Sequence, residues 1–210
     1  MNTRINETDD AATATPSLFR TRNGLAAAAR AEIVRLLNQR LADCIDLQGQ
    51  CKQAHWNVRG PQFIALHRLF DEVADDVAGY ADLIAERIAQ LGGVAEGTAQ
   101  VVARRSTLQA YPLTLTAGED HVAALSDALG DFAREVRIGI EEMNELEDAD
   151  AADILTSVSR GIDKWLWFVE AHLPPRQETV PDDVRVAEGK PSSTSERIQV
   201  TSNQRSSGQQ

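Results

Sequence analysis

Apolar side chains recur at helical spacing along most of this chain, and four long runs of them predict four helices. Gly and Pro residues bound these runs, notably Pro61 at the start of the second, Gly92-Gly93 at its end and Pro174-Pro175 after the last. The predicted helices cover residues 25–56, 61–91, 117–147 and 151–173. No segment alternates as a strand does. The pattern therefore predicts an all-α four-helix bundle.

The segments outside these runs set the predicted domain organisation. About 25 residues join the second and third helices, and they hold a short apolar run that predicts an extra helix near 98–104. A connection of this length permits a crossover along the bundle. Residues 1–23 and 174–210 are polar and poor in large apolar groups, which is typical of disordered tails. We thus expect one folded domain at 24–173.

The distribution of charge along the chain indicates which kinds of ligand it can bind. The net charge is −11, yet basic and acidic residues balance in each predicted tail, so the acidity lies in the bundle. An acidic surface repels nucleic acid and concentrates cations. Cys44 and Cys51 lie too far apart along one predicted helix for a disulfide, which fits a reducing compartment. The first residues lack the apolar segment of a signal peptide and no run is long enough to span a membrane, so we expect a cytoplasmic protein.

One spacing of metal-ligand residues stands out, H-x11-H-x3-D-x10-D-x3-E, formed by His55, His67, Asp71, Asp82 and Glu86. His67 and Asp71 share a face of the second predicted helix, as do Asp82 and Glu86. Three turns, about 16 Å, separate the two pairs, so one helix cannot bring both to one metal. A second copy packed antiparallel about a two-fold axis would join the two halves. The alternative is that these residues form an ordinary solvated face.

A family resemblance rests on these residues. The segment KQAHWNVRGPQFIALHRLFDEVADDVAGYADLIAERIAQLGG at 52–93, with EGTAQVV at 96–102 and ADILTSVSRGIDKWLWFVEAHL at 152–173, resembles the Dps family of mini-ferritins. The resemblance implies a ferritin-like bundle that assembles as a hollow homo-dodecamer with tetrahedral symmetry. It also implies intersubunit ferroxidase sites at which hydrogen peroxide oxidises Fe(II), with ferric mineral stored in the cavity. His55, His67 and Asp71 would come from one subunit, and Asp82 and Glu86 from its mate.

Further residues have weaker signals. Trp56, beside His55, is a packing residue or, by the resemblance, a redox residue of the catalytic site. Seven carboxylates between 141 and 153 form a solvated corner, or, by the resemblance, Asp150 and Asp153 line a pore through which iron enters. Glu72, Asp75 and Asp76 are either surface charges or sites of mineral nucleation, whereas His121 and His172 are expected at the surface or an interface.

Two other functions are alternatives to a ferroxidase. One is DNA compaction, for which Arg20 and Arg22 are the best candidate contacts. Tails without net charge, however, have little electrostatic attraction to a polyanion such as DNA. The other is a passive shell that sequesters metal without turnover.

Overall fold

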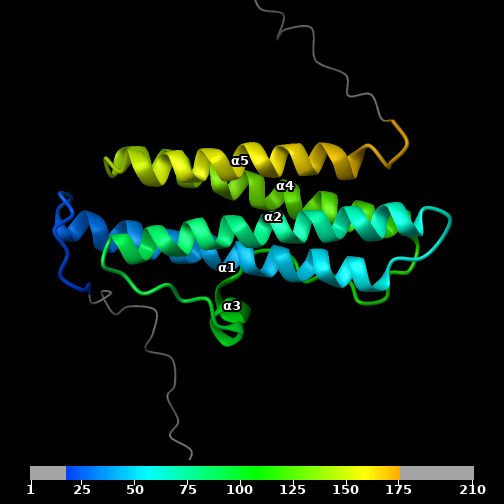
Figure 1. The fold of residues 1–210 in the computed structure, drawn as a ribbon, viewed down its shortest axis with the longest axis horizontal. Coiled ribbons are helices and arrows are strands. Elements are labelled where there is room, and N and C mark those ends of the chain that lie inside the picture. The colour runs from blue at the N-terminus through cyan, green and yellow to red at the C-terminus, as the bar shows by residue number, and fades with distance from the viewer. Residues whose placement is uncertain (1–17, 176–210) are drawn as a thin grey trace, which may run out of the picture. The chain divides into compact units, whose positions relative to one another are not determined.

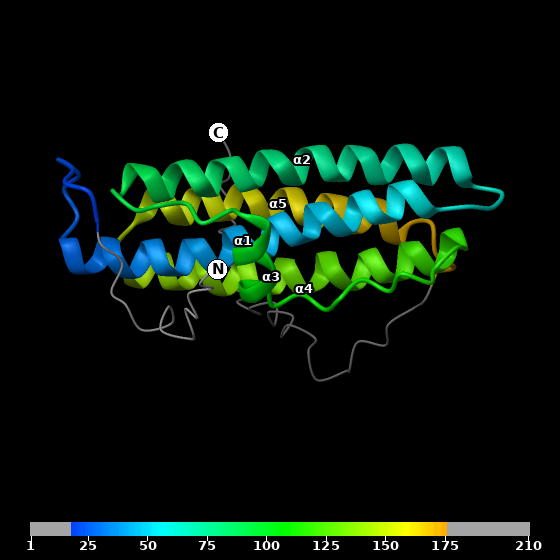
Figure 2. The same ribbon diagram turned by 90° about the horizontal axis from the view of Figure 1, so that it is seen from below.

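Four long helices lie side by side in the computed structural model, which describes residues 18–175 (Figure 1). Helix α1 packs against α2 and α4 against α5, and further contacts join α1 to α4 and α2 to α5 (Figure 2). Within the described residues there is no strand, only an isolated bridge between Arg59 and Ala117. The predicted all-α bundle and its extra short helix are confirmed. The helices are α1 (Ala27–Asn57), α2 (Phe63–Gln90), α3 (Ala99–Arg105), α4 (Gly118–Glu145) and α5 (Ala149–Glu170).

The ends of α2 show how local sequence sets the helix boundaries. Gly60 has a φ of 113° and its carbonyl accepts a hydrogen bond of 3.0 Å from the Phe63 amide. This turn contains Pro61, so α2 begins at Phe63, and the prediction that Pro61 occupies the first helical turn is wrong. At the other end Gly92, with a φ of 84°, donates to the Ala89 carbonyl, and Gly93 donates to that of Ile88. These bonds are those of a Schellman motif, in which glycine adopts the left-handed conformation without strain.

The core is built from large apolar side chains of all four long helices. Leu37 of α1, Phe70 of α2, Phe132 of α4 and Ile162 of α5 have no exposed surface. Each such side chain contributes about 1.5–3 kcal/mol when it leaves water. Among residues 18–175, no helix has both the length and the apolarity needed to cross a membrane.

The connection between α2 and α4 is fixed to the bundle by polar side chains of α1. Asn38 donates to the Val94 carbonyl (3.0 Å), and Gln50 donates to the Gln109 carbonyl (3.0 Å). Asp43, which is fully buried, accepts hydrogen bonds from the Thr107 amide (2.8 Å) and hydroxyl (3.1 Å). These contacts give hydrogen-bond partners to backbone groups of the connection.

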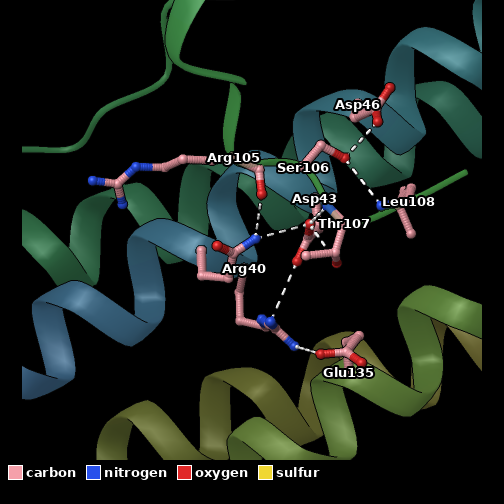
Figure 3. Close-up of polar contacts among 9 residues, drawn as sticks. Arg40, Asp43, Asp46, Arg105, Ser106, Thr107, Leu108 and Glu135 are labelled. Atoms are coloured by element: carbon pink, nitrogen blue, oxygen red, sulfur yellow. Dashed lines mark hydrogen bonds and ion pairs between the residues drawn. The ribbon is translucent and has the colours of Figure 1, made fainter. Parts of the chain in front are cut away.

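Arg40 extends the same network to α4. Figure 3 shows its guanidinium between the carboxylates of Asp43 and Glu135, at 3.4 Å and 2.6 Å. Close by, the Ser106 hydroxyl donates to Asp46. A polar stripe on α1 therefore holds α3 and the chain after it along one side of the bundle.

The crossover lets α4 start at the end of the bundle where α2 also starts (Figure 1). There the Arg59 amide donates to the Thr116 carbonyl at 3.0 Å, which ties the chain after α1 to the chain before α4. The predicted tail at 1–23 falls partly on described residues. Of these, Leu18 packs against the core, and the Phe19 amide donates to the Gly92 carbonyl at 2.7 Å.

Candidate metal centre

Two of the predicted ligands, His55 and His67, face each other across the α1–α2 pair. Their rings are stacked, with centroids 3.8 Å apart and planes inclined by 18°. His55 Nδ1 lies 2.7 Å from the His67 carbonyl oxygen, and His67 Nδ1 lies 2.8 Å from the His55 carbonyl oxygen. A carbonyl only accepts, so each Nδ1 carries a hydrogen. In the neutral rings both Nε2 atoms then hold free lone pairs, the arrangement by which proteins orient histidine as a metal ligand.

Asp71 is the third predicted ligand and lies beside the histidines. Its Oδ1 is 3.7 Å from His55 Nδ1, and the same oxygen is hydrogen-bonded to Lys52 Nζ. The hydrogen bond from Lys52 lowers the pKa of Asp71, and the carboxylate in turn raises the pKa of Lys52. Asp71 is therefore held as an anion next to two imidazoles, a set of donors that suits first-row transition metals.

Lys52 was not anticipated from the sequence, although its position three residues before His55 places both on one face of α1. Its ammonium also lies 3.9 Å from Asp75 Oδ1. A cation that binds Asp71 must compete with this ammonium. The cluster of His55, His67 and Asp71 therefore has its own positive counterion.

The other two predicted ligands lie apart from this cluster. Asp82 and Glu86 are exposed on α2, about 16 Å and about 22 Å further along the helix axis from Asp71. Within residues 18–175 no group of three or more His, Cys, Asp or Glu side chains is arranged to hold a metal ion. One chain thus presents two separate groups of ligand-type side chains.

Small side chains line a hollow beside Asp82, and large apolar side chains are exposed near the start of α2. Asp82 borders a hollow lined on α2 by Ala78, Ala81 and Ala85. On the same pair of helices Trp56 is 69 % exposed and Ile64 is 56 % exposed. Trp56 has too little contact with its own chain to be a core residue, so the packing role predicted for it requires a second chain.

The acidic corner divides into a buried and an exposed part. Asp148 is 2 % exposed, accepts a hydrogen bond from the Ala151 amide (3.1 Å) at the start of α5, and pairs with Arg87 Nη2 at 2.5 Å. Asp148 is thus a helix cap within a buried ion pair. By contrast Asp150 and Asp153, the candidate pore residues, are exposed, and Asp150 lies 3.4 Å from Arg87 Nη1.

The carboxylates proposed for mineral nucleation differ from one another. Glu72 and Asp75 are exposed on α2. Asp76 accepts a hydrogen bond of 2.8 Å from the indole N–H of Trp165, so it also holds α2 to α5. Arg20 and Arg22, the candidates for DNA contact, are exposed before α1.

His121 corrects one expectation. It was expected at the surface or an interface, yet it is 1 % exposed at the start of α4 and bonded to Tyr111. The cause is the connection before α4, which covers the ring, and no local signal in the sequence marked this. Burial lowers the pKa of His121, while the carbonyls of Leu115 and Asn57 oppose this shift. Both cysteines are buried and unpaired, as expected.

The fold class defined by this geometry agrees with known proteins. A family model described as a ferritin-like domain matches residues 34–175. DpsA14 from Streptomyces coelicolor, a solved structure 33 % identical in sequence, superposes with a TM-score of 0.73 over 77 % of this chain and 96 % of its own. The protein is therefore a member of the ferritin-like class.

Relatives in sequence narrow the class to one family. The DNA protection during starvation protein of Agrobacterium fabrum is 44 % identical over 73 % of this chain and 95 % of its own length. The protein of the same name from Mycolicibacterium smegmatis is 35 % identical over 71 % of this chain and 81 % of its own. The chain belongs to the Dps family.

Proposed function

We propose that this protein is a ferroxidase and iron-storage cage that oxidises Fe(II) with hydrogen peroxide at dinuclear sites shared between two chains. The observation that carries the proposal is the division of ligand-type residues. His55, His67 and Asp71 form one oriented cluster, whereas Asp82 and Glu86 lie about three and four turns beyond Asp71 on α2. Two chains related by a two-fold axis, with their α2 helices antiparallel, would complete two equivalent sites.

The ligand types suit iron as a substrate. Imidazole nitrogens bind ferrous iron, and carboxylates bind the harder ferric product. Hydrogen peroxide accepts two electrons and two protons to give two molecules of water, and two ferrous ions at one site supply both electrons. Paired transfer therefore avoids release of hydroxyl radical. Because Asp71 is already ionised, no proton has to leave it before iron binds.

The assembly and location belong to the same proposal. By family membership we propose a homo-dodecamer with tetrahedral symmetry, in the cytoplasm, with iron entering past Asp150 and Asp153. Both side chains are exposed at the start of α5. Residues that line a pore shared between chains must be exposed in the single chain. The names of the relatives suggest protection of DNA. Removal of ferrous iron and peroxide would provide that protection without DNA binding, which the acidity of the bundle does not favour.

Loss of iron oxidation in a His67→Ala, Asp71→Ala variant tests the proposed activity. Purified full-length protein receives Fe(II) without oxygen and then peroxide in steps, while ferric absorbance and bound iron are recorded. We expect peroxide-driven oxidation to fall to the rate without protein. The matched control is Arg68→Ala, which changes an exposed neighbour of His67 on α2. Wild-type rates in the double variant, with assembly intact by light scattering, would contradict the site assignment. Iron bound by the wild type without oxidation would favour the passive shell.

A further inference from the structure

A tyrosine and a histidine outside the proposed site form a hydrogen-bonded pair inside the protein. Tyr111 Oη lies 2.7 Å from His121 Nδ1, and the planes of the two rings differ by 17°. His121 is 1 % exposed and Tyr111 is partly buried. Because a phenol O–H is a good donor, Tyr111 donates to Nδ1 of the neutral imidazole. The pair therefore has a proton donor already aligned with a proton acceptor.

The surroundings of the pair favour the neutral form of both side chains before any electron is lost. Burial raises the pKa of Tyr111, so the phenol does not ionise by releasing a proton to water. Burial lowers the pKa of His121, and the carbonyls of Leu115 and Asn57 partly offset this shift. A phenol that loses an electron becomes a strong acid, and here its proton has an imidazole to receive it across a short hydrogen bond. The arrangement thus supports loss of an electron coupled to transfer of a proton.

The pair also lies against the helix that carries the proposed site. Asn57, whose carbonyl acts on His121, is the last residue of α1 and follows His55 by two positions. The Arg59 amide, bonded to the Thr116 carbonyl at 3.0 Å, holds the same end of α1 against the chain before α4. The end of α1 therefore joins the tyrosine–histidine pair to the His55 half-site.

We propose that Tyr111 and His121 form a proton-coupled electron donor, which supplies the second electron to hydrogen peroxide when a site holds only one ferrous ion. Peroxide, one Fe(II), the tyrosine, the neutral imidazole and two protons from solvent give Fe(III), a tyrosyl radical, an imidazolium and two molecules of water. The phenol proton moves from Tyr111 Oη to His121 Nδ1, and the electron passes to the site. The pair thereby prevents release of hydroxyl radical under low iron, a condition in which paired iron oxidation fails.

This inference rests on the proposed function, and the sequence offers a sharp control. The chain has two tyrosines, Tyr80 and Tyr111. Tyr80 lies on α2 against Gly161, next to Trp165 and Asp76, and has no imidazole partner among the described residues. Trp56, exposed beside His55, is the rival donor. Each of the variants Tyr80→Phe and Tyr111→Phe retains one tyrosine. A tyrosyl radical that disappears in one variant therefore belongs to the tyrosine that this variant lacks.

Freeze-quench electron paramagnetic resonance on the assembled protein tests the donor at less than one Fe(II) per site with peroxide. We expect a tyrosyl radical in the wild type and in Tyr80→Phe, and none in Tyr111→Phe. At high field the gx value of the tyrosyl radical should be lower than that of a tyrosyl radical without a hydrogen bond, because the imidazolium of His121 donates a hydrogen bond to the radical oxygen. Tyr111→Phe should also release more hydroxyl radical, measured by spin trapping. A tryptophan radical in the wild type, or a tyrosyl radical retained in Tyr111→Phe, would overturn the proposal.

A second arm separates this inference from the ferroxidase proposal. The iron-free protein is oxidised by one electron with a photogenerated ruthenium(III) complex and frozen. The same pattern of radicals is expected, and His121→Gln, whose amide accepts a hydrogen bond but not a proton, should lose the signal. Radicals spread equally over Tyr80 and Tyr111 would refute the pair as a preferred donor. If the iron-free pattern holds while the wild type oxidises no iron, the pair stands as a donor and the ferroxidase proposal fails.

Discussion

Mixing two inactive variants should restore activity, because the proposed site draws its ligands from two chains. The first variant, His67→Ala with Asp71→Ala, lacks one half-site, and the second, Asp82→Ala with Glu86→Ala, lacks the other. In a mixed two-fold pair, one site receives both damaged halves. The other receives both intact halves and is complete.

The size of the recovery follows from this symmetry. Random pairing of the two variants in equal amounts makes about half of the two-fold pairs mixed, and each mixed pair holds one complete site of two. About one quarter of the wild-type number of sites should therefore be active. Each variant alone should have none.

Co-expression with two affinity tags, followed by assay of ferric formation at excess peroxide, measures the recovery. Protein retained on both tags contains both variants in one assembly. A blend of the two variants, assembled separately and mixed after purification, is the matched control and should remain inactive. If co-assembled protein is as inactive as the blend, the ligands do not meet across chains. Substantial activity in either variant alone would show that one half-site suffices.

Three further predictions concern ionisable groups, two of which are buried. Asp148→Ala removes a helix cap, which costs about 1 kcal/mol. It also leaves the buried Arg87 with only the exposed Asp150, at 3.4 Å, as a carboxylate partner, which raises the loss of stability to about 3–5 kcal/mol. Thermal unfolding should show a large drop in melting temperature, and Asp148→Asn, which keeps the cap, should show a smaller drop. Asp150→Asn with Asp153→Asn should slow iron uptake with little change in melting temperature, because both side chains are exposed, and an unchanged uptake rate would favour the solvated corner. The pKa of His121 is lowered in the folded protein, so below about pH 6.5 the unfolded chain binds the extra proton and stability should fall as the pH falls. Melting temperatures between about pH 5 and 7 should show this slope, and His121→Gln should reduce it.

The local sequence was sufficient to predict the helices and to show that the ligand-type residues fall into two separate groups. The periodicity of Leu and Ile, with Gly92-Gly93 as a stop, marks helices whose ends differ from the structure by one or two residues in most cases. The start of α2 moved because the Gly60 carbonyl forms a turn with Phe63. Gly60 also has a positive φ of 113°, and a hydrophobic pattern encodes neither this backbone conformation nor the turn.

Within the candidate site, the sequence indicated which residues share a helix face but not what surrounds them. Lys52 is nineteen positions from Asp71, and only the pairing of α1 with α2 brings the two together. The same pairing gives each imidazole the carbonyl of the other histidine. The tautomers of His55 and His67 are therefore a consequence of tertiary contact.

By itself the sequence determined the features that depend on spacing along one helix. Helix geometry converts a spacing of three, four or eleven positions directly into a shared face and a distance along the helix axis. The sequence thereby determined four helices and two groups of ligand-type residues on one stripe of α2. Only the tertiary structure decided which polar residues are buried, because burial depends on segments remote in the sequence. The chain before α4 covers His121, Arg87 holds Asp148 sixty-one positions away, and the crossover covers Asp43.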